Sequence, residues 1–185
     1  MSVASLADRN RSQLVLVDVQ QKLCGAMPAE RLAPMLKNCG ILLQAAQLLE
    51  VPTIHSEQYP KGLGPTQAEL APWLASSQRV EKTSFSCCDS AAFCSLLEDA
   101  RDQVMLAGME AHICVLQTAL ALQASGKQVF VVEDAVLSRA PANQANALAR
   151  LRQAGVIVSN TESVLFEWLR VAEGDAFRQL SKLIR

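Results

Sequence analysis

The stretch that decides the fold is residues 104–122, VMLAGMEAHICVLQTALAL. Its first part, which ends at Gly108, is a short apolar run typical of a buried parallel strand. Its second part places Cys114, Val115, Thr118 and Leu122 at helical spacing. A strand that enters a helix through a tight turn predicts one strand–helix unit of a parallel α/β sheet.

Cys114 lies in the first turn of that predicted helix. Unpaired backbone N–H groups and the positive end of the helix dipole favour an anion there. We therefore expect the pKa of the thiol to fall and the thiolate to be populated, as in a nucleophile. The alternative is that Cys114 is a small buried apolar residue, and this stretch alone leaves both readings open.

Strands and helices alternate along the rest of the chain. The sequence predicts strands at residues 13–19, 51–56, 78–81, 104–108, 128–132 and 156–159. It predicts helices at 31–50, 91–99, 114–122, 141–154, 162–171 and 175–183, and Thr66 with Glu69 is a capping-box pattern for a short helix toward Trp73. We expect one α/β domain over residues 1–185, a Rossmann-like three-layer sandwich with helices on both faces of a six-stranded parallel sheet.

The expected strand order is 3-2-1-4-5-6, which opens a crevice at the carboxyl ends of the first and fourth strands. Asp18 ends the first strand, Cys114 follows the fourth, and Lys82 follows the third on the same rim. Asp18 alone is equally consistent with a residue that pins the next loop. The convergence of all three favours a cysteine-dependent enzyme.

Composition excludes several other classes. The net charge is −1 and no basic run is present, so we expect no nucleic-acid partner. No apolar run reaches membrane-spanning length and the first residues lack a secretory pattern, so we expect no membrane partner and a cytoplasmic location. The six cysteines contain no CxxC pair, which indicates reduced thiols and no structural zinc. The slightly positive mean hydropathy leaves room for an apolar surface patch that another copy of the chain covers, so we expect a homo-oligomer.

Three motifs resemble one known family: VDVQ with Asp18, EKTSFS with Lys82, and GMEAHICVLQTA with Cys114. Together they are similar to the isochorismatase-like cysteine hydrolases, and the EQYPKGLGPT segment resembles the branch of isochorismatase domain-containing proteins. The resemblance implies a catalytic triad. Cys114 is then the nucleophile, Asp18 the general base and later acid, and Lys82 the cation that keeps both in charged form.

The resemblance also implies an oxyanion hole made by the backbone N–H groups of Glu110 and Cys114, with a cis peptide between Met109 and Glu110. Its substrate is a small amide or a related C–N or activated carbonyl compound, hydrolysed through a thioester. The acidic Glu110 is unexpected beside an oxyanion, so its side chain should point away or pair with a cation.

Metal-dependent nicotinamidases of the superfamily use an Asp-x-His motif and a further histidine, whereas this chain has only His55 in that region. We therefore expect no metal and no cofactor. Position on the rim suggests further substrate contacts, although ordinary packing or solvent exposure explains each of them equally well: Gln20, Leu23, Tyr59, Phe85 and His112.

Two other functions stay open. An isochorismatase-type enzyme would hydrolyse a vinyl ether by protonation from Asp18 and would need no thiol. A non-catalytic scaffold would keep the fold alone, although a buried charged pair beside a thiol has no evident purpose in such a protein.

Overall fold

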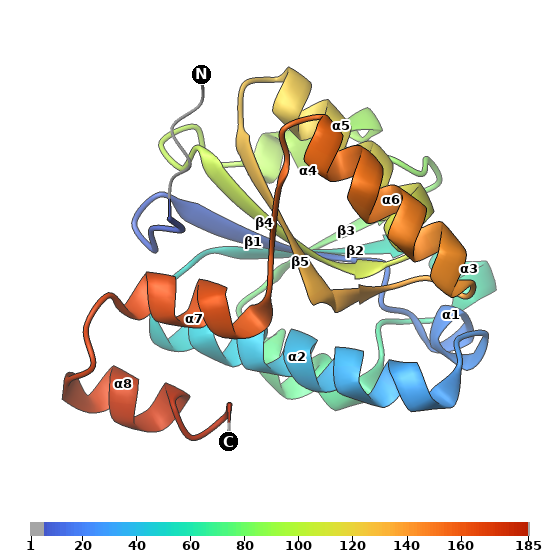
Figure 1. The fold of residues 1–185 in the computed structure, drawn as a ribbon. Helices are drawn as coiled ribbons and strands as arrows, with labels where there is room; N and C mark the ends of the chain where they lie inside the picture. The colour runs from blue at the N-terminus through green and yellow to red at the C-terminus, as the bar shows by residue number, and fades with distance from the viewer. Residues whose placement is uncertain (1–5, 185) are drawn as a thin grey trace.

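The computed structural model describes residues 6–184 and contains a six-stranded, wholly parallel sheet (Figure 1). The strand order is β3-β2-β1-β4-β5-β6, which confirms the predicted topology. The strands are β1 Ser12–Val17, β2 Thr53–Gln58, β3 Gln78–Lys82, β4 Gln103–Met109, β5 Gln128–Leu137 and β6 Ile157–Ser159. Because the strands are parallel, all six carboxyl ends lie at the same edge of the sheet.

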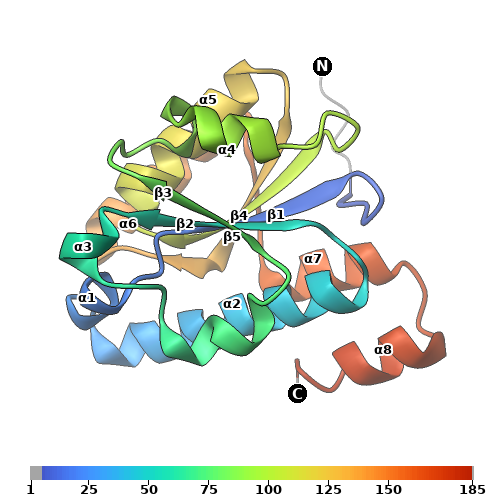
Figure 2. The same cartoon turned by 180° about the vertical axis from the view of Figure 1, so that it is seen from behind.

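Helices cover both faces of the sheet (Figures 1 and 2). One face carries α2 (Ala29–Leu48) and α7 (Thr161–Leu169), with α8 (Gly174–Leu180) packed outside them. The opposite face carries α4 (Ala91–Leu96), α5 (Leu116–Ala124) and α6 (Pro141–Gln153). Short helical turns complete the chain: α1 Gln21–Gly25, α3 Pro60–Leu63, η1 Ala68–Trp73, η2 Cys87–Asp89 and η3 Ala111–Val115. Across residues 6–184, no helix is both long and apolar enough to cross a membrane.

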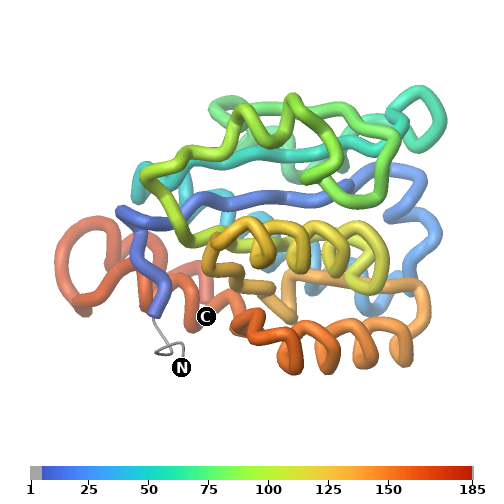
Figure 3. Tube along the Cα trace, turned by 90° about the horizontal axis from the view of Figure 1, so that it is seen from above, coloured from blue at the N-terminus to red at the C-terminus, as the bar shows by residue number. Residues whose placement is uncertain are grey.

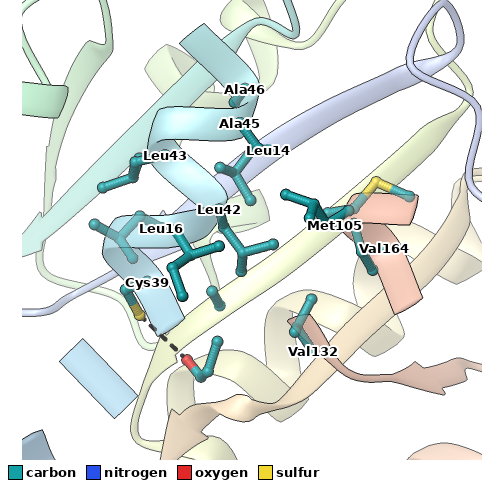
Figure 4. Close-up of a cluster of buried hydrophobic side chains, with 14 of the residues drawn as sticks. Leu14, Leu16, Cys39, Leu42, Leu43, Ala45, Ala46, Met105, Val132 and Val164 are labelled. Carbon is teal, nitrogen blue, oxygen red and sulfur yellow. Dashed lines mark hydrogen bonds between the residues drawn. The ribbon is translucent and has the colours of Figure 1, made fainter. Parts of the chain in front are cut away.

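The core forms because alternate residues of each central strand face opposite layers. Leu14 and Leu16 of β1 pack toward α2, as Figure 4 shows, whereas Val15 and Val17 pack toward α5. All four residues are at most 1% exposed. A central strand buried on both faces therefore has a continuous apolar sequence, which is why β1 and β4 were predictable.

β5 is longer than the sequence predicted. The expected strand ended at residue 132 because Glu133 and Asp134 interrupt the apolar pattern, but β5 continues to Leu137. The pairing of β4 with β5 changes register between Leu106 and Gly108, and the two acidic residues lie at this irregularity. Asp134 Oδ1 accepts hydrogen bonds from Thr161 N and Oγ1, both at 2.8 Å. The bulge thus places two charged residues without ending the strand.

The predicted capping box at Thr66 is wrong. Thr66 N and Oγ1 donate to Glu57 Oε1 at 2.6 and 2.8 Å, so this side chain holds the loop against β2. The short helix that follows begins at Ala68, after Gln67, and is a 3-10 helix.

The loops after β1, β2 and β5 gather at one end of the sheet, on the right of Figure 3.

Gly108 allows β1 and β4 to approach closely beside that end. Its φ angle is +117°, and it is the register partner of Val17. A Cβ atom at this position would lie 2.1 Å from the carbonyl oxygen of Val17 and 2.7 Å from its nitrogen. Because both obstructing atoms are backbone, the clash has no flexible side chain to relieve it.

We expect Gly108→Ala to lower the free energy of unfolding by about 3 kcal/mol or more, since it combines strain at positive φ with a backbone clash. Urea unfolding followed by circular dichroism measures the change. Gly126→Ala is the matched control, because Gly126 also has positive φ (+92°) but has no heavy atom within 4 Å of the added Cβ. Equal losses in the two variants would contradict the close-approach explanation.

Candidate active site

The ends of β1 and β3 and the turn after β4 bring Asp18, Lys82 and Cys114 to the carboxyl edge of the sheet. Asp18 is the first residue after β1 and has φ +50°, a left-handed conformation that Asp tolerates better than most residues. Lys82 is the last residue of β3, and Cys114 lies in the η3 turn that follows β4. All three are buried, at 0%, 6% and 5% exposure.

The carboxylate of Asp18 is held at both oxygens. Lys82 Nζ donates to Oδ2 at 2.6 Å, and Ser56 Oγ donates to Oδ1 at 2.7 Å. The side chains of the ion pair are 0% and 1% exposed, for Asp18 and Lys82 respectively. Removing a paired charge from water is costly, so this pair depends on further hydrogen bonds.

Lys82 supplies those bonds through its two remaining donor directions. Its ammonium group donates to the carbonyl oxygens of Ser84 at 3.1 Å and Phe85 at 3.2 Å, and more weakly to Gln58 Oε1 at 3.4 Å. The segment after β3 therefore folds back over its own last residue. This arrangement fixes the ammonium group between the Asp18 carboxylate and the side chain of Gln58.

The Cys114 thiol lies against the same group of residues. Cys114 Sγ donates to Gln58 Oε1 at 3.2 Å. Burial raises the pKa of the thiol most strongly, and the negative charge of Asp18 raises it further, while the positive charge of Lys82 opposes the shift. The expected fall of this pKa is therefore wrong: the first-turn position favours a thiolate less than burial and Asp18 disfavour it.

The structure adds two residues that the sequence reasoning missed, Ser56 and Gln58. Both lie at the carboxyl end of β2, two positions apart and so on the same face of the strand. The sequence did contain a sign of their role, because two polar residues at the end of a buried strand next to the crevice indicate a function at that end. The expected strand stopped at residue 56 and left Gln58 in a loop.

Glu110 directly follows β4, and the Met109–Glu110 peptide bond is cis. The Glu110 carbonyl accepts from the N–H groups of Ile113 at 3.0 Å and Val115 at 3.2 Å, on either side of Cys114 in sequence. The Glu110 carboxylate accepts from Arg139 Nε at 3.1 and 3.2 Å and from Arg139 N at 3.0 Å. Of the two alternatives for this side chain, pairing with a cation is therefore the one observed.

Comparison with known proteins shows the family to which this chain belongs. The sequence pattern of the isochorismatase domain matches residues 12–163. This chain belongs to the isochorismatase family. Isochorismatase domain-containing protein 2 of Bos taurus is 37% identical over 177 residues, which cover 94% of this chain and 83% of that protein.

Solved structures agree with the family assignment. The MAR1 ribonuclease from Caenorhabditis elegans superposes with a TM-score of 0.90 at 34% identity, covering 97% of this chain and 92% of the other. A cysteine hydrolase from Pseudomonas syringae superposes with a TM-score of 0.78 at 19% identity, covering 89% and 95%. At that identity the second likeness concerns the fold alone.

The five suggested substrate-contact residues of this isochorismatase-family chain lie in different environments. Tyr59 and Phe85 are 57% and 52% exposed and lie in the segments that follow β2 and β3. Leu23 is half-buried and packs against the core cluster beneath α2. His112 Nδ1 is 2.9 Å from Ser138 Oγ, and its Nε2 is 3.3 Å from Asn143 Nδ2. A substrate contact by any of these residues stays a prediction.

Gln20 is fully buried, and its side chain bonds to the backbone. Gln20 Oε1 accepts from Gln58 N at 2.7 Å, and Gln20 Nε2 donates to the carbonyl oxygens of Gln58 at 3.0 Å and Gly64 at 2.7 Å. These three bonds position Gln58 and the loop after β2. They leave the amide of Gln20 little capacity to bind a substrate directly.

A cavity of about 500 Å³ opens on the β3 side of Lys82. Tyr59, Lys61, Glu81 and Asp89 contribute to its wall, and Cys114 does not line it. This opening therefore approaches the ion pair from the side of the lysine.

His55, the one histidine near the expected metal position, contacts a serine side chain. Its Nδ1 is 2.9 Å from Ser77 Oγ, and burial lowers the pKa of the ring. Glu57, two residues later, accepts hydrogen bonds from Thr66 N at Oε1 and from Arg79 Nη1 at Oε2, the second at 3.3 Å. Within residues 6–184, no three His, Cys, Asp or Glu side chains are grouped so that they could hold a metal ion.

The raised thiol pKa gives a test of the site's electrostatics. Asp18→Asn removes the negative charge that raises the pKa of Cys114, so we expect Cys114 to react faster with iodoacetamide at pH 8, where the thiolate is scarce in the unmodified protein. Lys82→Met removes the opposing cation and should slow the same reaction. Peptide mass spectrometry follows each thiol separately.

The exposed Cys94 is the internal control, because its labelling rate should not change in either variant. Circular dichroism checks that both proteins are folded. If Cys114 then reacts at the same rate in Asp18→Asn and in the unmodified protein, the carboxylate and the thiol are not coupled.

Proposed function

We propose that this chain is a metal-independent cysteine hydrolase that acts on a small amide, or a related C–N or activated carbonyl compound, through a thioester. One observation carries the proposal: a buried carboxylate bonds an ammonium group at 2.6 Å, and Gln58 Oε1 accepts from both that ammonium group and the buried thiol of the adjoining π-helical turn. A protonated thiol beside a fixed base is suited to general-base-assisted attack.

In the first step Asp18 takes the proton of the Cys114 thiol while sulfur attacks the carbonyl carbon. The C–S bond forms, and the electron pair of the carbonyl moves to its oxygen. Backbone N–H groups of Glu110 and Cys114 receive the oxyanion, because Glu110 directly precedes the turn that carries the sulfur and Cys114 lies within that turn. Lys82 holds the Asp18 carboxylate in place through the 2.6 Å hydrogen bond to Oδ2.

In the second step the tetrahedral intermediate collapses. The C–N bond breaks, Asp18 returns its proton to the leaving nitrogen, and an acyl thioester remains on Cys114. A water molecule then gives a proton to Asp18 and adds to the thioester carbonyl. Release of the carboxylic acid regenerates the thiol and the ionised carboxylate, so the base acts twice as base and twice as acid.

The Glu110–Arg139 pair makes this mechanism electrostatically acceptable. A bare carboxylate at Glu110, 5% exposed, would repel the oxyanion that forms near its own backbone N–H. Arg139 neutralises that charge and also donates its backbone N–H to it. The acidic residue thus acts as an anchor for the segment after β5.

We also propose a small-molecule substrate and self-association, as the dimer or tetramer that the resemblance to the superfamily implies. The exposed aromatic side chains of Tyr59 and Phe85 flank the site, and the mean hydropathy of +0.16 leaves apolar surface that a second copy could cover.

Loss of the thiol tests the proposal. We expect Cys114→Ala and Cys114→Ser to lower hydrolysis of a panel of small amides by about 10³-fold or more, since removing a nucleophile removes the covalent route. Mass spectrometry of the unmodified protein, quenched in acid during turnover, should show the acyl group on the Cys114 peptide. Cys94→Ala is the control and should retain full activity, because Cys94 is exposed and outside the site.

Two results would contradict the proposal. Pyruvate release from isochorismate that survives Cys114→Ala would indicate vinyl-ether hydrolysis by Asp18. Cleavage of RNA by the unmodified protein and by Cys114→Ala at equal rates would instead extend to this chain the activity in the name of its Caenorhabditis elegans relative.

A further inference from the structure

Gln58 has a position in the site that the triad mechanism leaves unused. Its Oε1 accepts from Cys114 Sγ at 3.2 Å and from Lys82 Nζ at 3.4 Å. The orientation of the amide is chemically determined, because an ammonium group can only donate and so requires the oxygen end. The opposite end, Nε2, faces the carbonyl oxygen of Thr83 at 3.4 Å.

The backbone of Gln58 is fixed more firmly than a strand end usually is. Gln20 bonds both the N–H and the carbonyl oxygen of Gln58, at 2.7 and 3.0 Å, and Gln20 is itself completely buried. The next residue, Tyr59, adopts φ +40°, so the chain turns away directly after Gln58. The side-chain oxygen is therefore held in place beside the sulfur rather than reaching it from a loose loop.

This oxygen loses a donor during the reaction. When Cys114 passes its proton to Asp18 and bonds to carbon, the sulfur can no longer donate to Gln58 Oε1. The remaining donor, Lys82, is at 3.4 Å and is already committed to Asp18 at 2.6 Å. A half-buried acceptor left without a good donor is unfavourable, so a substrate that supplies a hydrogen-bond donor to this oxygen stabilises the reacting complex.

The group that replaces the S–H donor is restricted by position. A carbonyl carbon under attack lies next to the sulfur, its oxygen faces the backbone donors of Glu110 and Cys114, and its leaving group faces the Asp18 carboxylate that must protonate it. Gln58 Oε1 lies beside both the sulfur and Lys82, the partner of Asp18, and so on the leaving-group side.

We propose that Gln58 is a specificity-determining residue that accepts a hydrogen bond from an N–H on the scissile nitrogen. The substrates are then primary or secondary amides, and the site discriminates against esters and tertiary amides, which present no N–H there. In an ester, the alkoxy oxygen and Gln58 Oε1 would both be acceptors and would repel each other. A dialkylated nitrogen would leave Gln58 Oε1 without a donor. This inference rests on the proposed function and defines its substrate class.

The test compares three compounds with the same acyl group: the primary amide, the N,N-dimethylamide and the methyl ester. For each, kcat/KM and the rate of acyl-Cys114 formation are measured in the unmodified protein and in Gln58→Met, which keeps the length of the side chain but lacks a strong acceptor. We expect the preference for amide over ester to fall by about tenfold or more in Gln58→Met, through the amide rate.

Two further variants separate recognition from structure. Gln58→Glu keeps an acceptor and adds a negative charge beside the sulfur. It should retain the preference for N–H while slowing all three compounds and moving the pH profile of acylation upward. Gln117→Met is the matched control on the helix that follows Cys114, because Gln117 is exposed, and it should leave the ratios unchanged.

The outcomes are distinguishable. If the three compounds acylate Cys114 and Gln58→Met leaves their ratios within twofold of the unmodified protein, or lowers all three rates equally, the role of Gln58 is refuted while the hydrolase proposal stands. If no compound of several acyl series acylates Cys114 in the unmodified protein, the hydrolase proposal fails, and the substrate class fails with it.

Discussion

The buried ion pair between Asp18 and Lys82 is the interaction on which the site depends. Its 2.6 Å contact joins the ends of β1 and β3, two strands separated by β2 in the sheet. Pairs this deeply buried repay the loss of hydration only with help from other groups, here Ser56 on one oxygen and two backbone carbonyls on the ammonium. The pair thereby fixes the loops that surround the sulfur.

Much of the fold and three of the site residues were predictable from the sequence for physical reasons. Strands buried on both faces have continuous apolar sequences, as at residues 14–17, and parallel strands bring their ends to one edge. Asp18 interrupts such a run, and Cys114 and Lys82 follow two others, so topology alone placed them together. The resemblance to the isochorismatase family then supplied roles that spacing could not.

Other features depend on three-dimensional context that sequence patterns do not encode. The pKa of Cys114 is set by burial and by Asp18, which lies 96 positions away in the chain, so the local first-turn argument gave the opposite direction. β5 continues past Glu133 because a bulge places the charged residues without breaking the strand. The position of Gln58 beside the sulfur depends on Gln20, whose side chain holds the backbone of Gln58 in place.

β3 is an edge strand, with a neighbour on one side only, and it supplies Lys82. Edge strands separate from a sheet at lower free-energy cost than central ones, because half as many ladder hydrogen bonds must open. Local detachment of β3 would withdraw the ammonium group and leave the Asp18 carboxylate with Ser56 as its partner but without a cation. Chemical competence in this protein is thus tied to the integrity of an edge strand, so that fraying of β3 and loss of the ion pair are the same event.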